Sequence, residues 1–142
     1  MKKTLIFISL IVTMTWQCGG TEITENNFSD IIDMENPPKI EFDEKNYNFG
    51  SVIEGTEVTH RFTFTNVGKG TLLISAVNGD CNCTVPKSWT KEQIKPGEKG
   101  FVDVIFDTKG KVGENIKNIT ITANTKPTNT TVQMIGNVIG PK

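Results

Sequence analysis

The stretch that decides the fold is Val58-Thr59-His60-Arg61-Phe62-Thr63-Phe64-Thr65, in which apolar and polar side chains alternate. The valine and the two phenylalanines share one face of this run with His60, and the threonines and the arginine share the other. Because successive side chains of a β-strand point to opposite faces, the alternation predicts a strand with one buried and one solvated face.

The same period of two recurs along the chain from Lys39 onward, in short runs separated by glycine and proline. The other runs include residues 40–42, 47–49, 72–74, 102–106, 119–123 and 132–138. Pairs such as Asn78-Gly79 and Pro96-Gly97 favour turns between them, because glycine readily adopts a positive φ and proline presets φ. Six or seven short strands without a useful helical period predict an all-β fold, an antiparallel β-sandwich.

The apolar faces of these strands supply the predicted core of the sandwich. Two half-apolar sheets that face each other are the simplest arrangement that hides so many one-sided strands. The residues expected between the sheets are Phe42, Phe49, Phe62, Phe64, Leu72, Ile74, Val102, Val104, Phe106, Ile119, Ile121, Val132 and Met134. A domain of about 100 residues can bury such a core without disulfides as staples.

The N-terminal segment has the features of an export signal. Lys2-Lys3 precede an apolar run over residues 5–12, which is too short to cross a bilayer as a permanent helix. Cys18 stands where cleavage is expected, and the arrangement resembles a bacterial lipoprotein signal. The resemblance implies a signal peptide over residues 1–17 and an acylated Cys18 that anchors the mature protein in the cell envelope, on the periplasmic or cell-surface side of a membrane. Ordinary secretion and an uncleaved anchor are the alternatives.

Residues 18–38 predict a tether between this anchor and a domain at residues 39–142. The stretch has five acidic residues and no basic one, together with asparagine, serine and a Pro-Pro pair. Such a polar, breaker-rich composition is typical of solvated segments, with Phe28, Ile31 and Ile32 as the side chains able to touch the domain. The net charge of the whole chain is −1, so nothing in it suggests the basic footprint of a nucleic-acid-binding protein.

Cys81-Asn82-Cys83 is the one local motif that invites a chemical role, and it follows a predicted strand. In an extended chain the two α-carbons would lie roughly 6.5–7 Å apart with side chains on opposite faces, at or past the limit for a disulfide. A turn centred on Asn82 would shorten that distance. The alternatives are a disulfide, structural or redox-active, a soft-metal site for Cu(I) or Zn(II), and two small, partly buried structural side chains. The residues alone leave these alternatives open.

Two aromatic side chains are candidates for lesser roles. His60 lies on the apolar side of its strand, which favours a partly buried histidine with a satisfied ring nitrogen over a base or a metal ligand. Trp89 is either an exposed contact at an interface or a cover for one end of the sandwich. The chain lacks the motifs of nucleophile elbows, phosphate loops and zinc hydrolases, and it has a single histidine. We therefore assign no catalytic residue and no cofactor, and we expect no enzyme.

Several blocks of the sequence, taken in order, resemble one known family. The blocks are Phe49-Gly50, Ile53-Glu54-Gly55, residues 58–68, Leu72-Leu73-Ile74, residues 81–86, residues 94–98, residues 104–108 and Ile119-Thr120-Ile121. Over nearly all of residues 47–140 this order resembles the DUF1573 family. The resemblance implies an immunoglobulin-like domain of the MSP/ASH type, found on exported, often lipid-anchored proteins of Bacteroidota, and it implies no established activity. The family usually has glycine between the two cysteines; here Asn82 is expected to keep a left-handed turn, because asparagine tolerates that backbone best after glycine.

Together these features predict a non-catalytic, envelope-anchored binding or scaffold domain. Its partner would be another envelope protein or a glycan, bound through loop ends or an exposed sheet edge. The alternative is a thiol redox or soft-metal-handling protein that uses Cys81 and Cys83. A third possibility is a purely architectural spacer without a ligand.

Overall fold

The computed structural model describes residues 36–141. The predicted signal peptide, the lipidation site Cys18 and the tether up to residue 35 lie outside the described residues. The strands are β1 (Ile40–Phe42), β2 (Asn46–Ile53), β3 (Glu57–Asn66), β4 (Ile74–Gly79), β5 (Thr84–Trp89), β6 (Lys99–Asp107), β7 (Gly113–Ala123) and β8 (Asn129–Ile139). Over this range no helix has the length and apolar character needed to cross a membrane.

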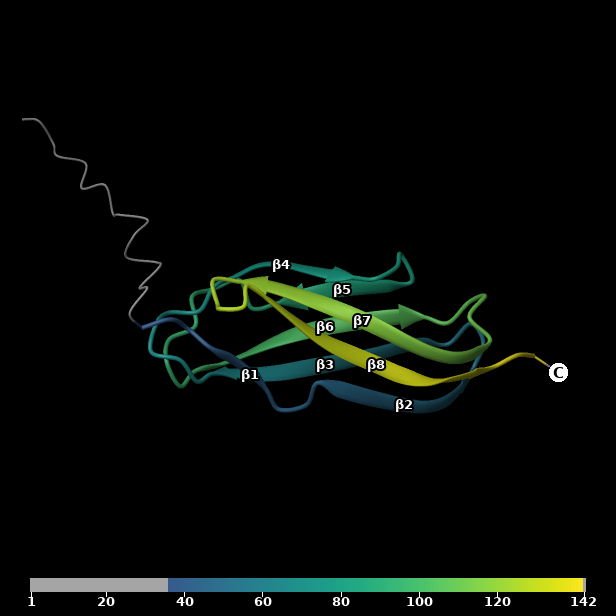
Figure 1. Cartoon of the computed structure of the whole chain (residues 1–142). Coiled ribbons are helices and arrows are strands. Elements are labelled where there is room, and N and C mark those ends of the chain that lie inside the picture. Colours follow the sequence, from purple (N-terminus) through teal and green to yellow (C-terminus); the bar gives the residue numbers. More distant parts are fainter. Residues whose placement is uncertain (1–35, 142) are drawn as a thin grey trace, which may run out of the picture.

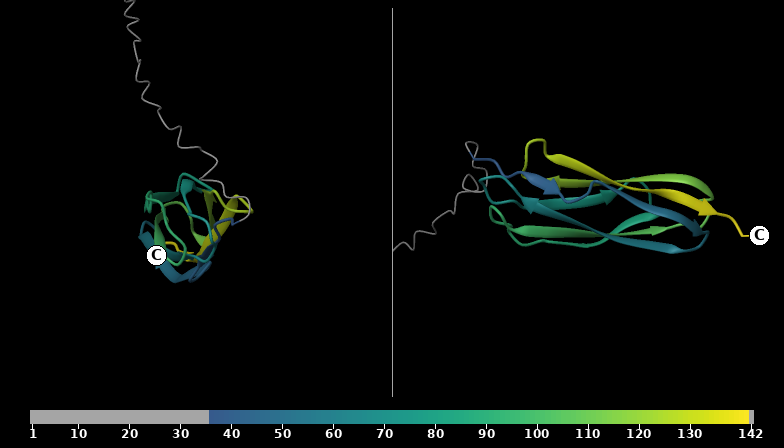
Figure 2. Two further views of the ribbon diagram at one scale, coloured as in Figure 1. Left: turned by 90° about the vertical axis from the view of Figure 1, so that its left-hand side faces the viewer. Right: turned by 90° about the horizontal axis from the view of Figure 1, so that it is seen from below.

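The strands form two four-stranded sheets that face each other (Figure 1). The first sheet has the order β1-β3-β6-β5, and the second has the order β2-β8-β7-β4. Figure 2 shows the sandwich end-on and lengthwise as an elongated body. The predicted all-β sandwich is therefore confirmed.

Two details of the predicted sandwich are wrong. β5 is a further strand, which the alternation did not reveal because it contains Pro86 and few apolar residues; proline is tolerated there because β5 lies at a sheet edge. β2 runs parallel to β8, with Asn46 opposite Gln133, whereas the other strand pairs are antiparallel. Alternation reports which face of a strand is buried, and it carries no information about the direction of the neighbouring strand.

The core lies between the sheets, and all of the predicted core residues except Phe49 are buried. Phe49 is half-buried because it lies at an irregularity in the edge strand β2. Its ring packs against Phe106 with the two centroids 5.7 Å apart. Gly136 on β8 makes room for this ring, since a Cβ there would overlap it. Buried hydrophobic residues beyond the predicted set are Val58, Val77, Ile94, Ala123 and Val138.

A fully buried asparagine, Asn66, closes the end of the sandwich at which the chain enters. Its Nδ2 donates to the carbonyl oxygens of Gly70 at 2.8 Å and Ile94 at 2.9 Å. Its Oδ1 accepts from the backbone N–H groups of Gly68 at 3.0 Å and Lys39 at 3.3 Å. The side chain therefore uses all four of its hydrogen-bonding positions, and it ties the incoming chain to two loops.

The two ends of the sandwich carry different elements (Figure 1). We call the end near Asn36 the N-terminal end and the opposite end, where β8 finishes, the C-terminal end. The N-terminal end carries the β7–β8 hairpin, and the C-terminal end carries the turn from β4 in the second sheet to β5 in the first, together with the loop between β6 and β7.

Each of the four edge strands is short or irregular. β1 has three residues, and the ladders of β2, β4 and β5 shift register at Asn48/Gly50, Ile74/Ala76 and Pro86/Ser88. Short or irregular edges discourage the addition of a further strand from another chain. The sheet edges are therefore poor binding sites, and the faces and the ends of the sandwich are the better candidates for a binding surface.

Candidate functional site

The Cys81-Asn82-Cys83 motif forms the turn between β4 and β5, and a disulfide joins its two cysteines. The α-carbons of Cys81 and Cys83 lie 5.2 Å apart, within the usual range for a disulfide. The distance is short because the chain turns here: the backbone N–H of Thr84 donates to the carbonyl oxygen of Cys81 at 3.0 Å. The expected left-handed backbone at Asn82 is wrong, since no non-glycine residue between positions 36 and 141 has a positive φ.

This turn leads from one sheet to the other and is attached to both. The carboxylate of Asp80 accepts from the backbone N–H of Asn118 on β7 at 2.9 Å, and the carbonyl oxygen of Cys83 accepts from the N–H of Asp107 on β6 at 2.8 Å. A Cβ at Gly79 would overlap the carbonyl oxygen of Thr84, so glycine permits the close approach of the two strands. Backbone and carboxylate contacts thus hold the turn in place independently of the disulfide.

The two sulfur atoms face different surroundings. Both cysteines are half-buried, and Cys83 packs against the core. Cys81 lines an open groove of about 330 Å³ together with Val77, Asn82 and Pro86. Because the sulfurs are bonded to each other, neither is a thiolate ligand in this state. In the described region of the chain no group of three or more His, Cys, Asp or Glu side chains is placed to hold a metal ion.

Reduction of the Cys81–Cys83 disulfide should lower the free energy of unfolding by only about 1.5 kcal/mol, because a loop of three residues loses little chain entropy when it is closed. The measurement is urea unfolding with and without a dithiol reductant, and a Cys81→Ala/Cys83→Ala variant, which should not respond to the reductant, is the control. A loss near 4 kcal/mol, the value for a loop of tens of residues, would contradict the expectation.

A charged network lies on the outer face of the first sheet. Arg61 on β3 donates from Nε to Oδ1 of Asp103 on β6 at 2.7 Å and from NH2 to Oδ2 at 2.8 Å. Ser88 on β5 donates to Oδ2 of Asp103 at 2.8 Å, and the guanidinium lies 4.2 Å from the ring centroid of Phe101. The hydrogen bond from Arg61 is the main cause that lowers the pKa of Asp103, and the same bond raises the pKa of Arg61. The network joins three neighbouring strands and has no reactive nucleophile in it.

The lowered pKa of Asp103 predicts a stability contribution that depends on pH. The contribution is present above the pKa of an unfolded aspartate, about 3.9, and it is lost as the pH falls through the lower pKa of the folded state. Replacement of Arg61 by methionine removes the main cause, so the stability difference between wild type and Arg61→Met should shrink as the pH falls from 5 to about 2. Chemical unfolding at several pH values measures this difference. The control is Lys99→Met, which removes an ammonium that lies 3.8 Å from the carboxylate of Asp43. A difference that stays constant with pH would refute the linkage.

His60 is enclosed by aromatic rings. The ring stacks on Tyr47 with the centroids 3.6 Å apart, and it meets the edge of Phe62 at 4.7 Å. Its Nε2 lies 2.7 Å from Oε1 of Glu44, yet the two atoms make no aligned hydrogen bond, so the ring is positioned by packing against its aromatic neighbours. The histidine therefore packs as a structural side chain, although without the directed hydrogen bond expected from the sequence.

Trp89 is the last residue of β5, half-buried and packed against the core. The Nζ of Lys91 lies 5.2 Å from the centroid of its ring. Of the two predicted roles, this position fits an aromatic side chain that covers one end of the sandwich better than an exposed contact at an interface.

The C-terminal end of the second sheet exposes aliphatic side chains that the sequence analysis did not single out. We call Ile53, Val112, Ile116 and Ile139 the aliphatic patch; their exposed fractions are 66%, 60%, 58% and 50%. Ile53 lies opposite Ile139 across the β2–β8 pair. The sequence carried a signal for them, because Ile53, Ile116 and Ile139 stand on the solvent side of alternating strands. Their neighbours on the inner side are buried (Asn115 and Val138) or half-buried (Val52).

A shallow cavity of about 360 Å³ adjoins this patch on the outer face of the second sheet. Its lining includes Ile116 and Ile135 together with the polar side chains of Asn48, Ser51 and Asn137. Glu114 and Asn137, which face each other across β7 and β8, lie between Ile116 and the adjacent pair Ile53 and Ile139. Exposed apolar side chains that gather among polar ones are typical of protein interaction sites. The patch is therefore the candidate interaction surface of the domain.

Comparison with solved structures places the fold. A protein of unknown function from Porphyromonas gingivalis W83 has a TM-score of 0.62 and 16% identity, over 70% of this chain and 46% of that one. The secreted serine protease VesC from Vibrio cholerae has a TM-score of 0.58 and 14% identity, over 80% of this chain and 25% of that one. The ASH/PapD-like domain of human CEP192 has a TM-score of 0.53 and 14% identity, over 75% of this chain and 89% of that one.

The chain thus spans less than half of the first two proteins and most of the human domain. At these identities the likeness concerns the fold alone, and it confirms the immunoglobulin-like sandwich. A search of curated proteins gave no match. The DUF1573 family, described as a protein of unknown function, matches residues 40–138, which is well over half of the 142 residues. The chain therefore belongs to the DUF1573 family, as its sequence motifs indicated.

Proposed function

We propose that this protein is a non-catalytic binding domain, anchored in the cell envelope through a lipid on Cys18, that docks another envelope protein on the aliphatic patch. The observation that carries the proposal is the patch itself, in which Ile53 and Ile139 are at least half exposed and lie opposite each other. Aliphatic side chains gain by burial against apolar protein surface, which favours a protein partner over a hydroxyl-rich glycan. The interrupted sheet edges support a docking mode that uses a face.

The docking surface is tested by Ile53→Ser/Ile139→Ser, with Val67→Ser/Val85→Ser as a control in which 46% and 52% exposed valines change elsewhere on the domain. Cross-linking in intact cells, followed by purification, should recover one defined partner with the wild type and the control, and the patch variant should lose it. Recovery that is equal in all three, or of envelope glycan in place of protein, would refute the proposed docking surface.

The anchor is tested separately. Cys18→Ser should move the protein from the membrane fraction to the soluble fraction, and mass spectrometry of the wild-type N-terminus should find an acylated cysteine. An unmodified Cys18 in a protein that is soluble after export would refute lipid anchoring and leave the docking surface untouched.

Thiol–disulfide exchange at Cys81 and Cys83 is a second candidate, favoured by the position of Cys81 on an open groove. A thiolate of a partner dithiol would attack Sγ of Cys81 and break the disulfide, so that Cys83 leaves as a thiolate. The second thiol of the partner would then resolve the mixed disulfide, which leaves both cysteines reduced and the partner oxidised. Equilibration against glutathione buffers measures the reduction potential; a value below about −300 mV, typical of inert structural disulfides, would end this candidate.

A further inference from the structure

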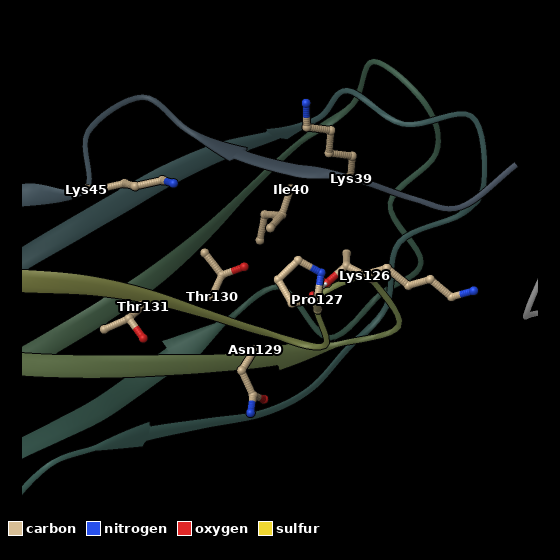
Figure 3. Close-up of a pocket in the computed structure, with 9 residues that line it drawn as sticks. Lys39, Ile40, Lys45, Lys126, Pro127, Asn129, Thr130 and Thr131 are labelled. Atoms are coloured by element: carbon tan, nitrogen blue, oxygen red, sulfur yellow. Dashed lines mark hydrogen bonds between the residues drawn. The ribbon is translucent and has the colours of Figure 1, made fainter.

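A second cavity, of about 340 Å³, lies at the N-terminal end between β1 and the β7–β8 hairpin (Figure 3). Its lining includes Ile40, Pro127 and Thr130, and Figure 3 shows Ile40 and Thr130 pointing toward each other across it. Lysine side chains stand around it, and no acidic residue is among those that line it; the lysines are Lys39, Lys45 and Lys126. The cavity therefore has an apolar and hydroxyl floor and a cationic rim, at which Lys45 points toward the cavity and the ends of Lys39 and Lys126 point outward (Figure 3).

The chain enters the domain beside this cavity. Lys39, which lines it, follows Asn36 by three residues. The backbone of residues 37–39 lies so close to Gly68 that a Cβ there would overlap it, and Asn66 holds the N–H of Lys39. The point at which the preceding segment joins the domain is therefore fixed next to the cationic rim.

The segment immediately before this point has the complementary chemistry. Residues 28–35 read Phe-Ser-Asp-Ile-Ile-Asp-Met-Glu, with four large apolar side chains, three acids and no base. Apolar side chains flanked by carboxylates match an apolar floor flanked by lysines. We propose that residues 28–35 bind in cis to the lysine-rimmed cavity, with an apolar side chain on Ile40 and Pro127 and the carboxylates near the lysines.

The energetics allow this contact. Exposed ion pairs contribute little each and weaken with salt, and the burial of an aliphatic side chain contributes more than such a pair does. A short linker raises the effective concentration of the segment to the order of millimolar, so a weak intrinsic affinity suffices. Binding would leave residues 18–27 alone to set the distance between Cys18 and the domain.

The test uses the chain from residue 18 with Cys18→Ala, so that Ser29→Cys provides the one free thiol beside the Cys81–Cys83 disulfide. A nitroxide spin label on that thiol should broaden the amide resonances of Lys45, Thr130 and Thr131. Lys45→Glu/Lys126→Glu should abolish the broadening, and Lys87→Glu/Lys109→Glu, the same charge change at exposed sites that do not line the cavity, should preserve it. High salt should reduce it.

Four outcomes would overturn the proposal. Three concern the labelled protein: the absence of broadening at these amides, an equal loss in the control variant, and broadening that Ile31→Ser/Ile32→Ser leaves unchanged. Vesicles of phosphatidylglycerol and phosphatidylcholine form the last arm. If the resonances of the cavity residues shift when these vesicles are added, and Ile31→Ser/Ile32→Ser does not affect them, the cavity binds the membrane surface. That result would refute the cis contact.

Discussion

Replacement of Asn66 by alanine should lower the free energy of unfolding by about 3 kcal/mol or more, because four hydrogen bonds from this fully buried side chain to partly or fully buried backbone groups are lost at once. The carbonyl oxygen of Gly70 and the N–H groups of Gly68 and Lys39 all bond to this side chain. The carbonyl oxygen of Ile94 suffers less, since it also accepts from the N–H of Leu72 at 2.8 Å. Urea unfolding monitored by tryptophan fluorescence measures the loss.

Asn48→Ala is the matched control for this prediction. Asn48 also accepts a hydrogen bond from a backbone N–H, that of Gly50 at 2.8 Å, but it is exposed. Water replaces the lost bond there, so we expect a loss of about 0.5 kcal/mol. Equal losses in the two variants would show that Asn66 does not hold the N-terminal end together.

Phe106→Ala should cost about 3–5 kcal/mol, the range for truncation of a buried aromatic side chain. Phe106 is fully buried, belongs to the first sheet and contacts Phe49 of the second, so its loss opens a cavity between the layers. Denaturant unfolding measures this loss. We expect the unfolding midpoint of Phe106→Ala to lie below the midpoints of all the surface variants.

Phe101→Ala tests whether this loss comes from burial. Phe101 lies on the same strand, but it is half-exposed on the outer face beneath Arg61. Phe101→Ala should lower the free energy of unfolding by less than half as much as Phe106→Ala does. A comparable loss would mean that the outer face contributes as much to stability as the core.

The two layers could be predicted from the sequence because burial in a sandwich repeats every second residue. The alternation around Phe62 and Phe64 identified the inner face of β3, and both residues are fully buried. It failed where the chain departs from regular pairing. Pro86 concealed β5, and the irregularity at Asn48/Gly50 moved Phe49 to the margin of the core. The parallel β2–β8 pair depends on which strands become neighbours, which no local pattern reports.

Less of the candidate site than of the fold could be predicted from the sequence. Cys81 and Cys83 stood out by residue type, but the choice among their states depended on a turn whose backbone is not the one expected at Asn82. Ile53 and Ile139 drew no attention because a single exposed isoleucine is ordinary. Only the register of β2 against β8 brings the two together, so the patch is a property of the tertiary structure.

The parallel pairing of β2 and β8 has a mechanical consequence. A force that pulls the two ends of the domain apart draws β2 one way and β8 the other, and it slides them along each other. The seven paired positions from Asn46 to Ile53 must then yield together, whereas the pairs of a hairpin separate in succession. Rupture under load follows the unfolding rate, not the equilibrium stability. The parallel pair therefore resists tension along the length of the domain better than a hairpin with the same number of pairs would.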